Sequence, residues 1–243
     1  MALARHVARM DSFPAGGLAA VIGSSGAIGG ALADRLEKSG RFLRVVRLGR
    51  TTVPPIDMTD ETTIVAAAGQ LAASPIPLRL VLDATGFLHD ADFMPEKALR
   101  QIDPEHMARA FAVNAIGPAL LMKHVLPRLP REGKSVFATL SARVGSISDN
   151  RLGGWYAYRA SKAALNQLVR TAAIELARKN PQAVCVALHP GTVDSALSAP
   201  FARTGLEVRA PETAAADLLS VIDGLTPAQS GGLYDHHGKA VPF

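Results

Sequence analysis

Cysteine is almost absent from this sequence, and its single copy, Cys185, sets two limits. One thiol cannot form a disulfide within the chain or supply a cysteine cluster for a metal ion, and we expect no metal site. Cys185 lies in an apolar run, which favours a buried structural thiol and fits a reducing cytoplasm. Runs of about 18 apolar residues, the length needed to cross a membrane, are also missing, so we expect no membrane partner.

Dense basic runs, and basic patches interleaved with aromatic residues, are missing as well. The net charge is +5, but the lysines and arginines are spread along the chain, which is typical of a solvated surface. We therefore expect no nucleic-acid partner. The first residues lack the apolar core of a signal peptide. We interpret residues 1–17 as a loose arm, with a short transit peptide as the less favoured alternative.

Short apolar runs alternate with helical patterns along nearly all of residues 18–243. This alternation predicts an α/β fold, a single-domain doubly wound parallel sheet of the Rossmann type with helices on both faces. Residues 87–101 are polar and lack firm periodicity, so we expect a surface excursion there. We expect strands at residues 18–22, 42–48, 56–60, 78–84, 135–140, 183–188 and 231–235, and helices at 31–38, 61–71, 103–129, 155–180 and 211–222.

A glycine-rich turn follows the first expected strand and precedes the first helix. Gly23, Gly26 and Gly29 would let the backbone approach a pyrophosphate that rests on free N–H groups at the helix N-terminus. Ser25 and Ile28 belong to the same turn, and we expect them to contact the cofactor. The alternative is a tight strand-to-helix turn that binds nothing.

The end of the second expected strand lacks the acidic residue that holds the ribose hydroxyls in NAD-binding Rossmann units. Arg47, Arg50 and the hydroxyls of Thr51 and Thr52 would instead suit a 2′-phosphate. We therefore expect NADP(H) to be favoured over NAD(H). The alternative is that these arginines only lie on the surface and that cofactor preference is set elsewhere.

Tyr158 and Lys162 lie four residues apart on the expected helix 155–180, so their side chains share one face. A phenol ordinarily loses its proton near pH ~10, and a neighbouring cation draws its pKa toward neutrality. Such a phenol is a general acid–base suited to carbonyl and alcohol chemistry. Tyr156 has Ala160 one turn on and lacks this partner. The same spacing also arises by chance, so its weight depends on the rest of the chain.

Asn114 is a polar residue in an apolar stretch of the expected helix 103–129. Gly117 and Pro118 should disturb the helix just after it, which would free a backbone carbonyl to hold a water. The alternative is a buried asparagine that is tied to the backbone.

Four segments that are distant in sequence fall at the C-terminal ends of the expected strands, where doubly wound sheets bind ligands. They are the glycine turn, residues 85–86, the loop after Leu140 and residues 190–191. We therefore expect a single site assembled from all four.

The motifs at these positions resemble those of the short-chain dehydrogenase/reductase family over nearly all of residues 18–243. Within that family the chain most resembles the carbonyl-reductase branch that includes the sniffer and C-signal proteins. The resemblance implies a nicotinamide-dependent oxidoreductase with Tyr158 as the general acid–base. The segments that carry it are residues 111–118, 141–150, 153–166 and 189–193.

The resemblance also implies a role for each matching residue. Lys162 would lower the pKa of Tyr158 and bind the nicotinamide ribose, and Asn114 would hold a water in the proton relay. Thr192 would lie near the nicotinamide carboxamide. The other implied cofactor contacts are Asp57 and Met58 beside the adenine, Ala84 and Gly86 after the third main strand, and Pro190 and Gly191 along the nicotinamide.

Three departures from the family pattern matter. Ala27 stands where the long form of the cofactor turn has its middle glycine, and residues 83–86 are Asp-Ala-Thr-Gly in place of Asn-Asn-Ala-Gly. The serine that should bind the substrate carbonyl is replaced by Ala142. Adjacent residues on an extended backbone point in opposite directions, so either the loop shifts to present Ser141, or Ser146 substitutes, or the oxyanion site is incomplete. We predict Ser141.

We therefore expect an NADP(H)-dependent oxidoreductase that transfers hydride between the nicotinamide and a small carbonyl or alcohol substrate. The alternative is an NADP(H)-binding signalling or regulatory protein with little turnover, motivated by Ala142 and by the resemblance to C-signal. The family implies a homodimer or homotetramer built on helices 103–129 and 155–180. Residues 87–101 and 195–209 should shape the substrate pocket, and their side chains suggest that it is apolar.

Overall fold

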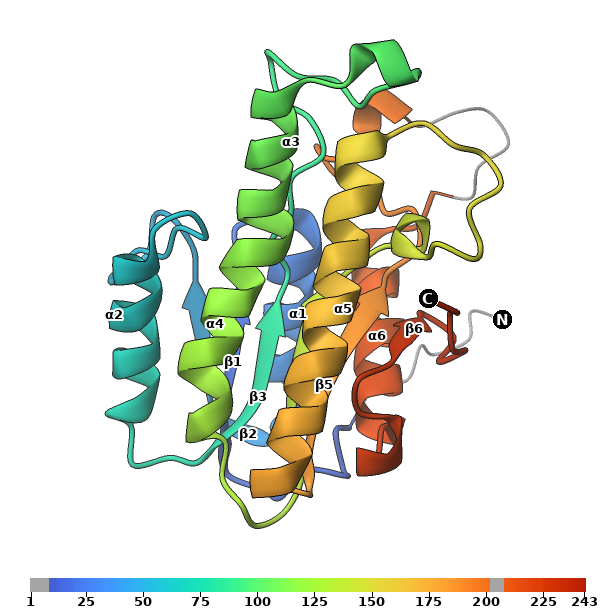
Figure 1. Ribbon diagram of the computed structural model, residues 1–243. Coiled ribbons are helices and arrows are strands. Elements are labelled where there is room, and N and C mark those ends of the chain that lie inside the picture. The colour runs from blue at the N-terminus through green and yellow to red at the C-terminus, as the bar shows by residue number, and fades with distance from the viewer. Residues whose placement is uncertain (1–8, 202–207) are drawn as a thin grey trace, which may run out of the picture.

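The computed structural model describes residues 9–201 and 208–243 as an α/β structure built on one parallel sheet (Figure 1). Its six strands are ordered β2-β1-β3-β4-β5-β6, and each neighbouring pair is parallel. The order reverses between β1 and β3, the place beyond which doubly wound sheets bind ligands. The strands are β1 Gly17–Ile22, β2 Phe42–Leu48, β3 Leu78–Asp83, β4 Ser135–Leu140, β5 Ala183–His189 and β6 Leu233–Asp235.

Helices cover both faces of this sheet, with α4 and α5 in front of the strands and α1 behind them in Figure 1. Leu18, Ala20 and Ile22 of β1 belong to the core under α2, α4 and α5. Ala19 and Val21 point the other way, into the core under α1 and α6. The predicted doubly wound sheet is confirmed. The helices are α1 Ala27–Ser39, α2 Glu61–Ala72, α3 Pro104–Phe111, α4 Gly117–Val125, α5 Tyr156–Lys179 and α6 Pro211–Gly224.

Residues 56–60 form a turn, so the prediction of a strand there was wrong. The Asp57 carboxylate accepts hydrogen bonds from the N–H and the hydroxyl of Thr59, at 2.8 and 2.7 Å. Side-chain bonds of this kind compete with an extended ladder, and here they outweigh a short apolar pattern. Asp60 then caps α2 by accepting from the Thr62 N–H at 2.9 Å.

Two residues of the stretch 9–16, Met10 and Phe13, belong to the core, which corrects the expectation of a loose arm there. Residues 1–8 lie outside the described part of the chain. Met10 and Phe13 are 0% and 1% exposed and pack into the core under α1 and α6. The Phe13 carbonyl oxygen also accepts a hydrogen bond from Arg41 Nε at 2.7 Å. The stretch before β1 is therefore fastened to the core by two side chains and to Arg41 by a hydrogen bond.

The expected helix 103–129 contains a π-helical segment, Ala112–Ile116, between α3 and α4. Pro118 has no N–H to donate to the carbonyl four residues back, that of Asn114, and its ring clashes with an ordinary α-turn there. The wider π turn relieves this conflict, and such segments are frequent at functional sites. By length and composition alone Pro104–Arg128 is long and apolar enough to cross a membrane, a test that core helices of soluble proteins also pass.

Candidate active site

The glycine turn closes tightly on itself at the start of α1. A Cβ on residue 29 would lie 2.2 Å from the Gly23 carbonyl oxygen, so only glycine fits there. Gly23 has φ +78°, and its carbonyl accepts the Gly26 N–H at 3.0 Å. Gly26 caps α1 without a side-chain hydrogen bond, and the first turn of α1 holds no acidic residue. This helix end therefore offers backbone N–H groups and the positive end of the dipole to an anion.

The turn adjoins the ends of β2 and β3. A Cβ built on Gly49 would lie 3.6 Å from Ser25 Oγ, and one built on Gly23 would lie 3.0 Å from the backbone of Ala84. Ile28 is half-buried and packs on the core under α1. The predicted cofactor residues Ser25, Ile28 and Ala84 are thus brought to one edge of the sheet.

Arg47 and Arg50, both predicted to bind a 2′-phosphate, differ in their surroundings. The Arg47 guanidinium donates to Glu37 at 2.9 and 2.8 Å and to Asp34 at 2.5 Å, so its donors are taken up by carboxylates of α1. This pairing argues against the role predicted for Arg47. Arg50 is exposed and makes no hydrogen bond or ion pair with any residue that the structure describes. Of the two arginines, Arg50 is therefore the one whose donors are free of the described part of the chain.

Of the predicted adenine pair, Asp57 and Met58, the second lies against α4. Hydrogen bonds from Thr59, and the nearby charge of Arg50, lower the pKa of the Asp57 carboxyl and keep it ionised at neutral pH. A Cβ on residue 117 would lie 2.7 Å from the Cβ of Met58, which is buried. The close approach of α4 to Met58 therefore requires glycine at position 117.

Tyr158 and Lys162 share one face of α5, with Lys162 Nζ 5.9 Å from the centre of the Tyr158 ring. Burial raises the pKa of Tyr158 to about 12, so the expected lowering of this pKa is wrong. Burial also lowers the pKa of Lys162 to about 8, against the charge of Asp83, which raises it. The ammonium donates to the Leu140 carbonyl oxygen at 2.7 Å. Desolvation of the phenol therefore outweighs the effect of the neighbouring cation.

The Asn114 side chain is 1% exposed and tied to the backbone, one of the two possibilities that the sequence leaves open. Its Oδ1 accepts from the Phe87 N–H at 2.8 Å. Its Nδ2 donates to the Phe87 carbonyl at 2.7 Å and to Ser161 Oγ at 3.1 Å. A Cβ on Gly86 would lie 3.8 Å from Asn114 Oδ1 and 4.0 Å from Lys162 Nζ. Asn114 thus fastens the segment after β3 to the π-helical segment, beside Lys162.

The Ser141 hydroxyl is directed to α5, where it donates to Asn166 Oδ1 at 2.7 Å. Ala142 follows in an extended conformation, with φ −144° and ψ 147°. Ser146 is 1% exposed, and its Oγ accepts from the Asp149 N–H at 3.2 Å. The Ser141 proton is therefore taken up by Asn166, which argues against the predicted role of Ser141. The Ser146 hydroxyl only accepts in its bond to Asp149, so both Ser146 as a substitute and an incomplete oxyanion site agree with these bonds.

Residues 190–192 leave β5 in a turn that Arg209 braces. Gly191 has φ +80°, and a Cβ there would lie 3.3 Å from the His236 ring. The Arg209 guanidinium donates from Nη1 to the Pro190 carbonyl at 3.2 Å. The backbone N–H of Arg209 donates to the Thr192 carbonyl at 2.9 Å. The turn is therefore fixed at the same strand-end edge as the glycine turn.

Two buried acids near this edge were not predicted. Asp83 is 1% exposed at the end of β3, and its carboxylate accepts from Thr85 and Thr139. Glu96 is 2% exposed, and its carboxylate accepts the Ala157 N–H at the start of α5 at 3.2 Å. The sequence marked Asp83 only as a departure from the family motif. No local pattern points to Glu96, because its partner is 61 positions away.

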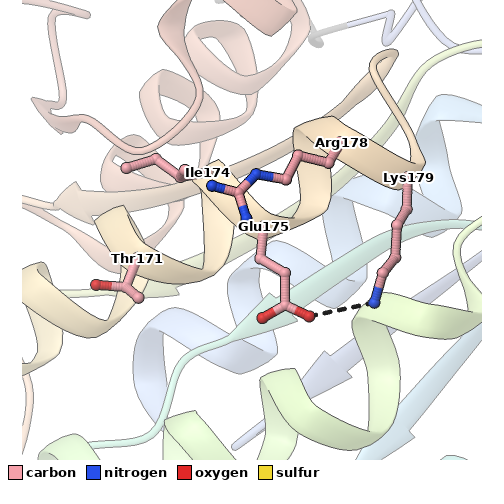
Figure 2. A pocket seen from close by; sticks show the side chains of 5 residues that line it. All are labelled: Thr171, Ile174, Glu175, Arg178 and Lys179. Carbon is pink, nitrogen blue, oxygen red and sulfur yellow. Dashed lines mark hydrogen bonds and ion pairs between the residues drawn. The ribbon is translucent and has the colours of Figure 1, made fainter.

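A surface hollow on α5 lies apart from these residues. Its volume is about 420 Å³, and Glu175 and Lys179 pair across it at 3.3 Å. Tyr158 lies toward the other end of the same helix, roughly 20 Å away at 1.5 Å per residue, so the hollow is separate from the strand-end site. Within the described residues no three His, Cys, Asp or Glu side chains are placed to hold a metal ion. The hollow is lined by Thr171, Ile174, Glu175, Arg178 and Lys179 (Figure 2).

Comparison with known proteins places the chain among oxidoreductases. A family model described as enoyl-(acyl carrier protein) reductase matches residues 22–216. C-signal of Myxococcus xanthus is 40% identical over 147 residues, which are 60% of this chain and 84% of that protein. The 1-hydroxy-2-glutathionyl-2-methyl-3-butene dehydrogenase of Rhodococcus sp. (strain AD45) is 33% identical over 183 residues, 75% of this chain and 76% of that enzyme.

Solved structures share the fold. NADPH-bound carbonyl reductase from chicken fatty liver superposes with a TM-score of 0.80 at 24% identity, over 94% of this chain and 99% of that one. Carbonyl reductase Sniffer of D. melanogaster gives 0.79 at 18% identity, over 94% of this chain and 100% of that one. Because the family model spans most of the sequence, the chain belongs to the short-chain dehydrogenase/reductase family of oxidoreductases.

Proposed function

We propose that this chain is an NADP(H)-dependent oxidoreductase that transfers hydride between the nicotinamide and a small carbonyl or alcohol substrate, with Tyr158 as the general acid–base. The observation that carries the proposal is the place of Tyr158 and Lys162, together on one face of α5, at the sheet edge where the glycine turn opens α1. The reaction needs a proton donor and a dinucleotide site at one edge.

The residues at this edge fit a dinucleotide. The N-terminus of α1 would hold the pyrophosphate. Gly29 lets the turn close because it has no side chain, and Gly26 makes no side-chain cap, so the N–H groups of the helix end are available to the phosphates. Asp57 and Met58 would lie beside the adenine, and residues 190–192 along the nicotinamide. When bound, the cofactor supplies or accepts the hydride.

The preference for NADP(H) is supported by the charges at the end of β2. Arg50 is exposed, and the described part of the chain offers it no hydrogen-bond or ion-pair partner, so its donors are available to a 2′-phosphate. Arg47 would contribute less, because it is already paired with carboxylates of α1. The chicken carbonyl reductase of similar fold is the NADPH-bound form.

The proton would move through Tyr158. During reduction its hydroxyl would donate to the substrate oxygen, and burial keeps that hydroxyl protonated at neutral pH. Lys162 is charged below its pKa of about 8 and would stabilise the phenolate as it forms. Pro118 leaves the Asn114 carbonyl without its usual helical donor. A water held there would return a proton toward Tyr158.

The test is reduction of a panel of aldehydes and ketones, followed by the loss of NADPH absorbance. Tyr158→Phe removes the phenolic proton and keeps the ring, and Tyr156→Phe is the matched control on the same helix. We expect Tyr158→Phe to lower kcat by at least about 10²-fold with NADPH affinity retained, and Tyr156→Phe to leave both unchanged. Full turnover by Tyr158→Phe on a verified substrate would contradict the assignment.

A signalling or regulatory protein that binds NADP(H) with little turnover is the second candidate. C-signal is 40% identical to the matched part of this chain, and Ala142 stands beside a serine whose hydroxyl is bound to Asn166. Losing one oxyanion donor costs ~10²–10³ in turnover. This candidate predicts tight NADP(H) binding and no reduction of any carbonyl. Reduction that disappears in Tyr158→Phe would exclude it.

We also propose a homodimer or homotetramer that forms through α4 and α5. The groove between these helices is lined largely by apolar side chains, among them Met122, Leu126 and Leu168, and Ile174 is 47% exposed on α5. Light scattering coupled to gel filtration should give at least twice the protomer mass.

Burial raises the pKa of Cys185 to about 12, and such an inert thiol suits the reducing cytoplasm that we propose.

A further inference from the structure

Trp155, the single tryptophan of the chain, has a left-handed backbone immediately before α5. Its φ is 53°, and those of Gly153 and Gly154 before it are 64° and 65°. A bulky residue in this region is uncommon and persists only where its surroundings fix it. Glycine would adopt this conformation more easily. We therefore expect the indole ring to make contacts that a glycine could not make.

Glu96 supplies the contacts that fix this turn. Its backbone carbonyl accepts the Trp155 N–H at 2.5 Å, and its carboxylate accepts the Ala157 N–H at 3.2 Å. The carboxylate also stands at the N-terminus of α5, where the helix dipole favours negative charge. Residues 87–101, expected to be a surface excursion, are therefore anchored to the start of α5 through a buried side chain.

The Trp155 ring contacts both Tyr158 and the segment after β5. Its centre lies 6.1 Å from that of the Tyr158 ring and 5.0 Å from that of Phe201, with interplanar angles of 72° and 61°. His89 packs edge-on against Phe201 at 5.4 Å. Edge-to-face contacts at these distances are favourable. The two segments expected to shape the substrate pocket thus meet through aromatic rings next to the proposed proton donor.

We propose that Trp155 and Phe201 form an aromatic wall of the substrate site and select carbonyl compounds with an aromatic ring beside the carbonyl group. This inference rests on the proposed function, because it names the substrate class of that same site. A flat ring gains offset or edge-to-face contacts with such a wall that a saturated ring of equal size does not.

The kinetic test compares acetophenone with cyclohexyl methyl ketone, which has the same carbon skeleton without aromaticity. Wild type, Trp155→Phe and Trp155→Leu are assayed with NADPH; the last keeps an apolar side chain and removes the ring. We expect wild type to favour acetophenone in kcat/KM by about five- to tenfold. Trp155→Phe should keep this preference and Trp155→Leu should lose it, mainly through KM. A preference that is absent in wild type or unchanged in Trp155→Leu would overturn the proposal.

A second measurement is independent of turnover. Trp155 fluorescence is titrated with each ketone on protein saturated with NADP⁺, and N-acetyltryptophanamide is titrated in parallel to correct for absorption. Saturable quenching with a Kd at least about fivefold lower for acetophenone supports the aromatic wall; equal Kd values, or no saturable change, overturn it. If wild type reduces neither ketone nor any other carbonyl, the proposed function fails, and the fluorescence preference still decides whether the wall selects aromatic ligands.

Discussion

The Lys162 ammonium donates a hydrogen bond to the Leu140 carbonyl oxygen at 2.7 Å, which ties the first half of α5 to the C-terminal end of β4. Lys162 is only 3% exposed, and a buried ammonium is costly unless it is paired. The centre of the Tyr158 ring lies 5.9 Å from the Lys162 ammonium nitrogen. A charge maintained at this cost beside a phenol agrees with the proposed proton transfer through Tyr158, and a stable fold does not need it.

Lys162→Met should therefore stabilise the fold at neutral pH while it removes turnover. The folded-state pKa of about 8 lies below the ordinary 10.5, so below pH 8 the lysine is charged in both states and its burial opposes folding in full. The difference between the two pKa values corresponds to at most about 3 kcal/mol of lost stability. The hydrogen bond to Leu140, which Lys162→Met also removes, reduces the gain in the variant. Between pH 8 and 10.5 the folded protein releases this proton, so wild type gains stability relative to the variant. Urea unfolding at pH 7 and pH 10 measures the difference in unfolding free energy between Lys162→Met and wild type, which should be smaller at pH 10. A difference that stays constant or grows would contradict the account.

Arg50→Ala should weaken NADPH binding while Arg47→Ala, a matched control on the same strand end, should not. A charge-assisted hydrogen bond contributes about 1.5–3 kcal/mol, which corresponds to roughly a 10- to 100-fold rise in Kd. NADH binding should be unchanged in both variants. Titration of each cofactor on each protein measures this directly. If Arg47→Ala has the larger effect, the arginine must leave Glu37 to reach the cofactor, and the assignment of Arg50 is wrong.

Much of the fold could be predicted because it depends on local pattern. Alternating apolar runs and helical periodicity placed the sheet and its helices, and the cap of α2 at Asp60 could be identified from its residue type. Two errors arose where long-range or side-chain contacts decide. The Asp57 carboxylate turned an expected strand into a turn, and Phe13 is buried by elements that follow it in sequence.

The candidate site, like the fold, could be predicted only where local pattern decides the structure. The spacing of Tyr158 and Lys162 on a helix placed them on one face, since that depends only on helical geometry. Side-chain direction and burial were not predictable, because both depend on distant partners. Ser141 is engaged by Asn166, and the pKa of Tyr158 is raised by burial and is not lowered by its neighbour.

Gly29→Ala should disrupt the cofactor turn, with Gly69→Ala as its control. A Cβ on residue 29 would lie 2.2 Å from the Gly23 carbonyl oxygen, so the backbone must shift, at about 1–3 kcal/mol. A Cβ on residue 69, within α2, meets nothing within 4 Å, and alanine there should stabilise the helix by about 1 kcal/mol. Thermal unfolding and NADPH titration of both variants check this. NADPH affinity that survives Gly29→Ala would show that the turn does not hold the cofactor.

Glu96→Ala should cost stability and activity together, because the carboxylate caps the helix that carries Tyr158. It removes the acceptor for the Ala157 N–H and leaves His106 without the oxygen that lies 3.6 Å from its Nδ1. We expect a loss of about 1–2 kcal/mol in unfolding free energy and a lower kcat. Glu61→Ala is the control, since that carboxylate bonds Lys123 and His124 near the surface and its removal should cost less stability than that of the Glu96 carboxylate. If the two variants lose equal stability and neither loses activity, the buried acid is not what positions the start of α5.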